Sequence, residues 1–143
     1  MLTNVLRISS DNSELDIDVV YDFLHKHAAW SKGIGRETVE RAIERSLCFG
    51  GYLGQRQVAF ARVVTDMATF AYLCDVFVLP EFQTRGYAHA LLDHIFGSDL
   101  LKGLRRIVLV TSNAHGVYKR HGFTNISHPE RYMELYRPNI YSA

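Results

Sequence analysis

The sequence lacks long apolar runs and an excess of charge of either sign. Its 16 Lys and Arg residues are balanced by 15 Asp and Glu residues, giving a net charge of +1, so no surface for nucleic acid or an anionic membrane is indicated. No apolar stretch approaches the roughly 20 residues of a membrane-spanning helix, and the first residues, MLTNVLRISSDN, lack the apolar core of a secretory signal. We therefore expect a cytoplasmic protein without a nucleic-acid or membrane partner.

Cysteine is scarce, and no cluster of metal ligands is visible. The two cysteines, Cys48 and Cys74, lie in apolar, strand-like segments, which favours buried reduced thiols over a disulfide or a metal site. His25 and His27 are two residues apart and His89 and His94 are five apart, so neither pair shares a helix face. We therefore expect no bound metal.

Proline is also rare, and nothing in the sequence resembles a linker or an internal repeat. The three prolines stand at expected element ends, and 48% of the 143 residues are hydrophobic. A chain of this length can bury about two thirds of its surface around one core. We expect a single domain over residues 1–143.

The first fifty residues predict a short strand and two helices. Residues 5–9 are strand-like, and apolar residues recur at helical spacing over 16–27, with Ser13 as a plausible cap near the start. Thr38 is expected to cap a second amphipathic helix.

Three β-rich segments follow. Residues 47–53 and 58–65 flank a glycine-containing turn and predict an antiparallel hairpin. Residues 70–79 continue this meander after a polar turn at 66–69.

The chain is organised around the next stretch, a strand, a loop and a helix. The strand ends at Pro80, and the loop over 83–88, QTRGYA, leads into a helix that ends near Phe96. A glycine at the start of a helix lets unpaired backbone N–H groups converge on an anion, and Arg85 adds a cation. Neither a Walker-type phosphate loop nor the three-glycine dinucleotide fingerprint is present.

The C-terminal third predicts one buried strand, a short helix and further strands. Ile107 to Val110 form a continuous apolar run, typical of a strand that is buried on both faces and reached by a parallel crossover. A helix is expected over 114–121, with Gly122 as its terminator. We expect one strand that begins at Phe123 and a last strand over residues 131–136.

Two ordered motifs carry a family resemblance. The pattern from Gln83 to Ala88, after a strand that ends in Val-x-Pro, resembles the acyl-CoA loop of the GNAT acetyltransferases. The pattern Ala114, Tyr118, Gly122-Phe123 is similar to the helix and turn that follow in that family. The clear match covers about residues 59–124. It implies an α/β (α+β) GNAT fold, with a mixed sheet of about six to seven strands, an antiparallel meander, a parallel crossover and about four helices.

The resemblance implies acetyl-CoA as co-substrate. In such a fold the pantetheine arm enters between the strand that ends at Leu79 and the strand of 106–110. Val78 N–H, or a near neighbour, would then bind the thioester carbonyl. Thr111 stands where family members often carry the Asn that seats pantetheine, and Asn113 is displaced from that position by two residues. The implied acetyl-CoA contacts are Phe77, Val78, Gln83, Thr84, Arg85, Gly86, Tyr87, Ala88, Thr111 and Asn113.

Tyr118 occupies the position from which the family's tyrosine faces the thioester sulfur. Proton transfer from a tyrosine of pKa about 10 to a thiolate whose acid has a pKa near 8.5 is uphill by roughly 2 kcal/mol. We therefore expect Tyr118 at least to stabilise the departing thiolate by a hydrogen bond. Packing is the alternative role for this side chain.

An amine acceptor must lose a proton before it attacks, and Asp75 is our candidate base. Strand alternation places it on the same face as Phe77. Asp75 could instead bind the ammonium while water removes the proton, or serve only as a structural carboxylate. Trp30, Arg36 and Tyr72 are candidates for the acceptor pocket, although core or surface roles are equally open to them.

The leading functional hypothesis is transfer of acetyl to a primary amine, and a small molecule is favoured because the near-neutral charge offers no docking field for a basic peptide. A protein N-terminus or lysine is the alternative acceptor. A non-catalytic acyl-CoA-binding or sensory module is the alternative class. The resemblance implies a possible homodimer, since many relatives form dimers through terminal strands. The apolar-rich tail MELYRPNIYSA would suit that use or could equally cover its own core, and the sequence does not decide between them.

Overall fold

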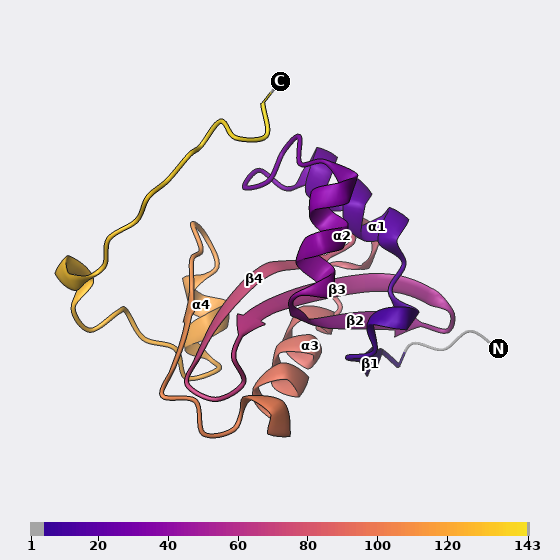
Figure 1. Cartoon of the computed structure of the whole chain (residues 1–143). Helices are drawn as coiled ribbons and strands as arrows, with labels where there is room; N and C mark the ends of the chain where they lie inside the picture. The colour runs from indigo at the N-terminus through magenta and orange to yellow at the C-terminus, as the bar shows by residue number, and fades with distance from the viewer. Residues whose placement is uncertain (1–4, 143) are drawn as a thin grey trace.

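The computed structural model describes residues 5–142, which fold around one five-stranded sheet (Figure 1). The strands follow one another across the sheet in chain order, with antiparallel pairing from β1 to β4 and parallel pairing of β4 with β5. The expected meander and parallel crossover are confirmed. The strands are β1 (Arg7–Ser9), β2 (Leu47–Leu53), β3 (Arg56–Thr65), β4 (Phe70–Val78) and β5 (Arg106–Leu109).

Four α-helices accompany the sheet within residues 5–142, in agreement with the mixed α/β class that was expected. Helices α1 and α2 pack on one face of the sheet, and α3 packs on the other (Figure 1). Helix α1 continues into a π-helical turn over Phe23–His27, so the helical segment reaches the predicted end. The helices are α1 (Ile17–Asp22), α2 (Arg36–Glu44), α3 (Tyr87–Phe96) and α4 (His115–Lys119).

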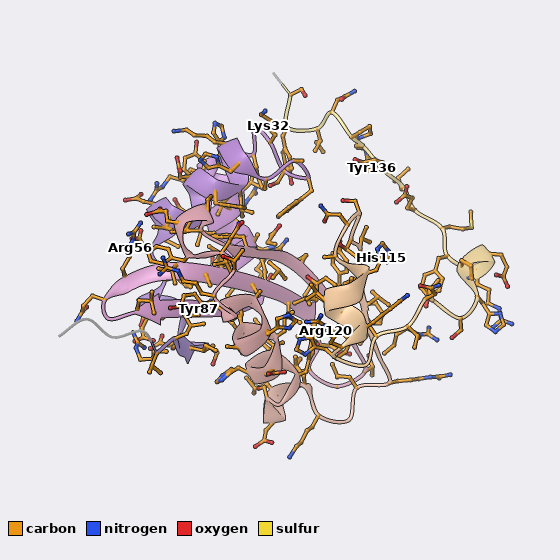
Figure 2. The ribbon with its side chains drawn as sticks, turned by 180° about the vertical axis from the view of Figure 1, so that it is seen from behind. Lys32, Arg56, Tyr87, His115, Arg120 and Tyr136 are labelled. Carbon is orange, nitrogen blue, oxygen red and sulfur yellow. The ribbon has the colours of Figure 1, made fainter. Side chains whose placement is uncertain are left out.

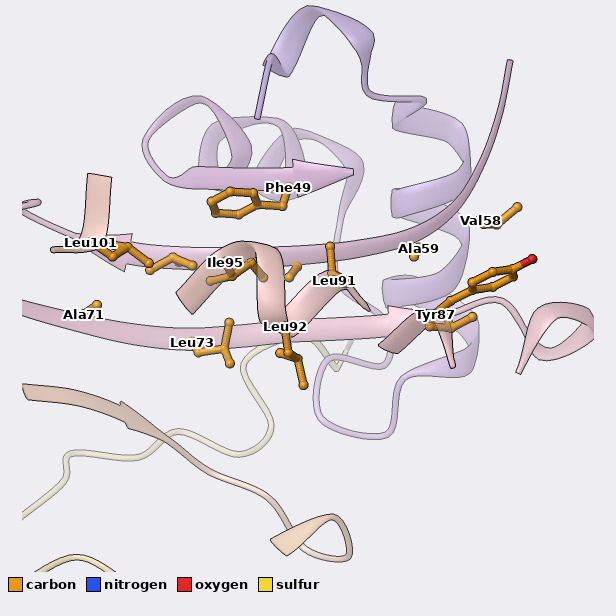
Figure 3. Packing of buried hydrophobic residues seen from close by; sticks show 13 residues of the cluster. Phe49, Val58, Ala59, Ala71, Leu73, Tyr87, Leu91, Leu92, Ile95 and Leu101 are labelled. Carbon is orange, nitrogen blue, oxygen red and sulfur yellow. The ribbon is translucent and has the colours of Figure 1, made fainter. Parts of the chain in front are cut away.

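Helix α3 anchors the sheet through one apolar side. Leu91, Leu92 and Ile95 are almost fully buried and lie against Phe49 and Leu73 of the strands (Figure 3). Complete burial of one such side chain contributes about 1.5 to 3 kcal/mol. This packing fixes the helix, and with it the loop at its N-terminal end.

Both helix caps expected from the sequence are wrong by a few residues. Asp16, rather than Ser13, caps α1 by accepting a hydrogen bond from Val19 N–H at 3.3 Å. Helix α2 begins at Arg36 after Gly35, so Thr38 lies inside its first turn. Several residues near these ends can cap a helix, and tertiary packing selects the one that is used.

The sheet has five strands in the described residues, and the expected number of six to seven is wrong. Neither the segment from Phe123 nor residues 131–136 form a strand. Consequently β5 pairs only with β4, and its residues are half-buried or exposed rather than buried on both faces. A strand needs a neighbour to satisfy its backbone groups, and within residues 5–142 neither segment pairs with the outer edge of β5.

Candidate active site between strands β4 and β5

Strands β4 and β5 separate before β4 ends. Their pairing runs from Phe70 opposite Arg106 to Leu73 opposite Leu109. Strand β4 continues to Val78, so its residues from Cys74 onward have no partner on the β5 side. A gap opens there along the edge of β4, as the GNAT resemblance implied.

The amide of Val78 is directed toward this gap. Leu79 N–H donates to the carbonyl oxygen of Val58 on strand β3 at 2.8 Å. Successive amides of a strand point to opposite sides, so Val78 N–H points away from β3. The side-chain amide of Gln83 donates to the Val78 carbonyl oxygen at 3.0 Å on that same side. It ties the loop after β4 to the edge of the gap.

Phe77 lies beside Val78 but cannot offer its ring to the gap. The ring is buried and stacks on Phe23 at 4.0 Å between ring centroids, with Phe60 at 5.7 Å. Only the backbone of Phe77 remains to border a ligand in the gap.

The loop before helix α3 has the geometry of an anion-binding turn. Thr84 and Gly86 both have positive φ angles, 64° and 83°, which turn their neighbouring amides inward. The first intrahelical bond of α3 joins Ala90 N–H to the Gly86 carbonyl oxygen at 3.1 Å, so the amides before Ala90 precede the helical ladder. Arg85 holds its guanidinium carbon 5.3 Å from the centre of the Phe82 ring. One side-chain cation and the positive end of a helix dipole thus meet at this loop.

The remaining loop residues offer mainly backbone groups. The Tyr87 ring is buried against helix α3 and the sheet (Figure 3). Ala88 is partly buried, and the Thr84 hydroxyl donates to the neighbouring Gln83 carbonyl oxygen at 2.6 Å. Among the side chains of residues 83–88, that of Arg85 is therefore the one available to contact a phosphate.

Asp75 stands at an irregularity of strand β4. Phe77 pairs with Phe60 and Cys74 pairs with Arg62, so β4 has one more residue than β3 between the two pairs. Asp75 has a φ of 53°, a conformation that strands otherwise avoid. Asp75 is thus turned out of the regular strand path.

Two donors hold the Asp75 carboxylate. Arg62 Nε donates to Oδ2 at 2.8 Å, and Trp30 Nε1 donates to Oδ1 at 2.8 Å. The Asp75 side chain is only 10% exposed and that of Arg62 is 20% exposed. Ser46 Oγ accepts a further hydrogen bond from Arg62 Nη1 at 3.1 Å. Neither Arg62 nor Ser46 was expected at the site, because only strand pairing and bulging bring them to Asp75.

The two cysteines flank Arg62 across the sheet, since Arg62 pairs with Cys48 on one side and with Cys74 on the other. Both are free; Cys48 is buried and Cys74 is partly buried. Burial raises the pKa of each thiol to about 12. They are neutral neighbours of the Arg62–Asp75 pair.

Trp30 is brought to Asp75 by a loop that is tied to the preceding helical turn. Ser31 Oγ donates to the Leu24 carbonyl oxygen at 2.8 Å, and Gly33 N–H donates to the His25 carbonyl oxygen at 2.9 Å. The Trp30 ring remains largely exposed. The Trp30 ring therefore forms a solvent-accessible wall beside the Asp75 carboxylate.

The other two candidates for the acceptor pocket differ in their surroundings. Arg36 is engaged by Asp18 at 2.7 Å and Glu40 at 3.1 Å, so its polar contacts lie on helices α1 and α2 and not on Asp75. Tyr72 is partly buried on β4, and burial raises its pKa. It lies on the same strand as Asp75, three residues away.

Tyr118 projects from the short helix α4. It is partly buried, burial raises its pKa, and its ring meets that of Phe123 edge-on at 6.0 Å. In the described part of the chain its hydroxyl has no hydrogen-bond partner.

Thr111 Oγ1 accepts a hydrogen bond from Ala114 N–H at 3.1 Å and so fastens the start of α4, whereas Asn113 is exposed.

A cavity of about 690 Å³ lies along β5 and includes Tyr118 in its wall. It is bounded by β5, helix α4 and residues 122–127, and none of its lining residues comes from β4 or from the loop over 83–88. The lining thus comes from the β5 side of the gap, and Thr111 and Tyr118 stand at the cavity wall.

A histidine cluster joins helix α3 to the end of α4 and was missed from the sequence. His121 Nδ1 lies 3.2 Å from an Asp93 carboxylate oxygen, and His121 Nε2 lies 3.3 Å from His89 Nδ1. Spacing within one helix could not reveal this contact, because His89 and His121 are 32 residues apart and lie on different elements.

No group of three metal-binding side chains occurs among residues 5–142. None of the helices described there is long and apolar enough to cross a bilayer.

Comparison with known proteins identifies the family. The chain matches the family model of the acetyltransferase (GNAT) domain over residues 44–125. The crystal structure of a Xanthomonas campestris protein assigned to the GNAT family is 51% identical, with a TM-score of 0.95 and coverage of 99% of both chains. That match therefore includes the C-terminal segment of this protein.

Two further relatives agree. A Gibberella zeae protein classed as an acetyltransferase is 29% identical, over 74% of this chain and 71% of its own length. A Clostridium acetobutylicum protein classed as an acetyltransferase, in a crystal structure with acetyl-CoA, shares the fold with a TM-score of 0.65 at 19% identity, over 95% of this chain and 96% of its own. By the domain match and the half-identical Xanthomonas relative, this protein belongs to the GNAT family of acetyltransferases.

Proposed function

We propose that this protein transfers the acetyl group of acetyl-CoA to a primary amine of a small molecule, by direct attack of the amine in a ternary complex. The observation that carries the proposal is the gap between β4 and β5. Strand β4 runs on past its last pairing with β5, and Val78 N–H points into the opening. This arrangement fits an acyl-pantetheine arm, whose amides would pair with the free strand edge.

The two ends of that arm have matching groups. The turn at Thr84 and Gly86, whose positive φ angles redirect the neighbouring amides, suits the pyrophosphate together with Arg85. Backbone N–H groups at a helix start and a cation both favour anions. Val78 N–H suits the thioester carbonyl oxygen, which gains negative charge when the amine attacks. Loss of one such donor typically raises a barrier by about 3 to 4 kcal/mol. The Clostridium relative binds acetyl-CoA in the same fold, which supports this co-substrate.

Asp75 and Trp30 suit the acceptor end. An alkylamine with a pKa near 10.4 is nearly all ammonium at pH 7, and reaching the neutral nucleophile costs about 4 to 5 kcal/mol. A carboxylate has about four acceptor positions, and Arg62 and Trp30 occupy two of them. Asp75 can therefore still bind an ammonium, either taking its proton or passing it to water. Its recessed position behind the Trp30 ring suits a slender amine.

Tyr118 suits the departing sulfur. Burial raises the pKa of Tyr118, so complete proton transfer to the thiolate is uphill by more than the roughly 2 kcal/mol of an unperturbed pair. The same shift keeps the hydroxyl protonated and available as a donor. We assign Tyr118 the role of stabilising the thiolate by a hydrogen bond.

The test is thiol release from acetyl-CoA with a panel of amino acids, polyamines, aminoglycosides and short peptides. Release with one class of small amine supports the proposal and identifies the acceptor, whereas release with peptides alone would favour a protein acceptor. The Tyr118→Phe variant should lower kcat by about tenfold to a hundredfold, as expected for a hydrogen bond to a charged group, and leave acetyl-CoA affinity unchanged. The matched control is Tyr52→Phe, a buried tyrosine on β2 whose hydroxyl has no partner in the described structure.

Two outcomes would contradict the proposal. If acetyl-CoA raises the melting temperature while no small amine or peptide releases thiol, the protein is a binding module or requires a protein acceptor. If Tyr118→Phe turns over like Tyr52→Phe, the role of Tyr118 is packing alone.

A further inference from the structure

Helix α4 carries Tyr118 but has little packing of its own. It runs over only five residues, His115–Lys119, and none of them is buried. A helix this short is not stable by itself, so contacts outside α4 must fix its place. Figure 2 shows α4, between the labelled His115 and Arg120, beside helix α3, which begins at Tyr87. The residues that join these two helices therefore also position Tyr118.

The connection between α4 and α3 is made by His121, which follows the end of α4. The His121 side chain is only 8% exposed, and its Nδ1 lies 3.2 Å from an Asp93 carboxylate oxygen. Its Nε2 lies 3.3 Å from Nδ1 of His89, and the two rings are stacked at 5.5 Å between centroids. Asp93 and His89 both stand on α3, so one nearly buried imidazole joins the helices through both of its nitrogen atoms. These contacts are the histidine bridge.

Two sets of contacts connect His121 with Tyr118. His121 N–H donates to the Tyr118 carbonyl oxygen at 2.9 Å. The ring of Phe96 on α3 lies 5.6 Å from that of His121 and 5.2 Å from that of Phe123, measured between centroids. The Phe123 ring in turn meets the Tyr118 ring edge-on at 6.0 Å. A displacement of the His121 ring would therefore move both the backbone and the ring of Tyr118.

Hydrogen bonding in the bridge depends on which nitrogen atoms carry protons. An ionised carboxylate only accepts, so His121 donates from Nδ1 to Asp93. In the neutral ring Nε2 is then an acceptor, and His89 donates to it from Nδ1. One added proton is tolerated, because a charged His121 donates from both nitrogens while His89 accepts. A second is not, because two N–H donors of like charge would face each other across 3.3 Å.

The charges around the bridge oppose the second proton as well. Asp93 is the carboxylate that His121 contacts on α3. The ionisable side chains that share the cavity wall with His121 are those of Arg105, Arg106, His115, Tyr118 and Lys119. Apart from the tyrosine, these are cations or become cations in acid, so they repel a further positive charge. The bridge therefore persists with one charged histidine and opens with two.

We propose that His121 is a positioning residue for Tyr118. Its hydrogen bonds to Asp93 and His89 hold α4 against α3, so that the Tyr118 hydroxyl is kept where it can donate to the departing thiolate. This inference rests on the proposed role of Tyr118 in acetyl transfer. Turnover should therefore fall as the pH drops through the range in which histidines gain a proton. The KM for acetyl-CoA should change little, because the loop over 83–88 is not part of the bridge.

The dependence of kcat on pH tests this role in variants of His89. His89→Asn places an amide near the position of the imidazole Nδ1, and the amide can donate or accept but does not titrate. This variant should keep the wild-type kcat at neutral pH and extend it to lower pH. His89→Leu removes the hydrogen bond and should lower kcat about tenfold at neutral pH, with the KM for acetyl-CoA unchanged.

His94→Leu is the matched control, since His94 is an exposed histidine on the same helix and takes no part in the bridge. It should follow the wild-type profile. The acceptor amine loses its proton in every variant alike, so the differences between variants isolate the bridge. A decline of kcat toward low pH that is the same in His89→Asn and in the wild type would overturn the proposal.

Two measurements without substrate test the bridge independently of acetyl transfer. In nitrogen NMR at mildly alkaline pH, the neutral His121 ring should carry its proton on Nδ1. Amide exchange over residues 115–121 should be faster in His89→Leu than in the wild type and unchanged in His94→Leu. A proton on Nε2, or equal exchange in the two leucine variants, would overturn the proposal even if an amine releases thiol. If both measurements agree and no amine releases thiol, the proposed function fails and the bridge does not, so the two failures are distinguishable.

Discussion

Removal of the cation beside Asp75 should be among the most damaging single changes in this protein. In Arg62→Met a similarly long apolar side chain replaces the guanidinium, and the Asp75 carboxylate keeps only the Trp30 hydrogen bond. The ion pair is short, at 2.8 Å, and its side chains are 20% and 10% exposed. Breaking a buried pair from one side leaves an uncompensated charge and typically costs about 3 to 5 kcal/mol. We expect a loss in that range at pH 7.

The chain provides a matched control in Arg56, which pairs with Glu81 at 3.2 Å. These side chains are 56% and 62% exposed, so solvent screens the pair and Arg56→Met should cost no more than about 1 kcal/mol. The double variant Arg62→Met/Asp75→Asn removes both buried charges. It should recover part of the loss seen in Arg62→Met, because a neutral amide is less costly to bury than a carboxylate.

Urea unfolding at equilibrium measures these differences directly. The reasoning is refuted if Arg62→Met loses no more stability than Arg56→Met, since burial would then have no effect on the strength of the pair. It is also refuted if the double variant is less stable than Arg62→Met. Either result would mean that water reaches Asp75 freely.

Three further predictions concern the site. Asp75→Asn should alter the dependence of kcat/KM on pH, and an unchanged profile would exclude Asp75 as the base. Gly86→Ala should cost about 1 to 2 kcal/mol of stability, because Gly86 has a φ of 83°, and should raise the KM for acetyl-CoA; Gly116→Ala, within helix α4 and without a positive φ, should cost nothing. Cys48 and Cys74, with pKa values raised to about 12 by burial, should alkylate about a thousandfold more slowly at pH 8.5 than an unperturbed thiol, and rapid labelling in the native state would contradict their burial.

The elements around the site could be predicted because their signals are local. The hairpin of β2 and β3, the strand, loop and helix around Gly86, and the short helix of Tyr118 each carry their apolar spacing and turn residues within about twenty positions. The separation of β4 and β5 was implied by the resemblance to the GNAT family. These parts required no knowledge of which residues meet across the fold.

The environment of Asp75 could not be predicted in the same way. Regular alternation assigns Asp75 a strand face, but it does not reveal the extra residue in β4 or the φ of 53°. Arg62 is 13 residues away and Trp30 is 45 residues away in the sequence. Arg36 looked equally suited to the acceptor pocket, and only the fold shows that Asp18 and Glu40 engage it.

The sequence by itself determined the layered α/β class, the GNAT motifs and the loop that precedes α3, since these depend on short-range spacing. Tertiary structure alone decided the contacts of Asp75, the histidine bridge between α3 and α4, and the number of strands. Whether residues 131–136 form a strand depends on a neighbouring edge and not only on their own pattern. Residues 131–136 carry the pattern but do not pair with the outer edge of β5 in the described structure, so the segment forms no strand.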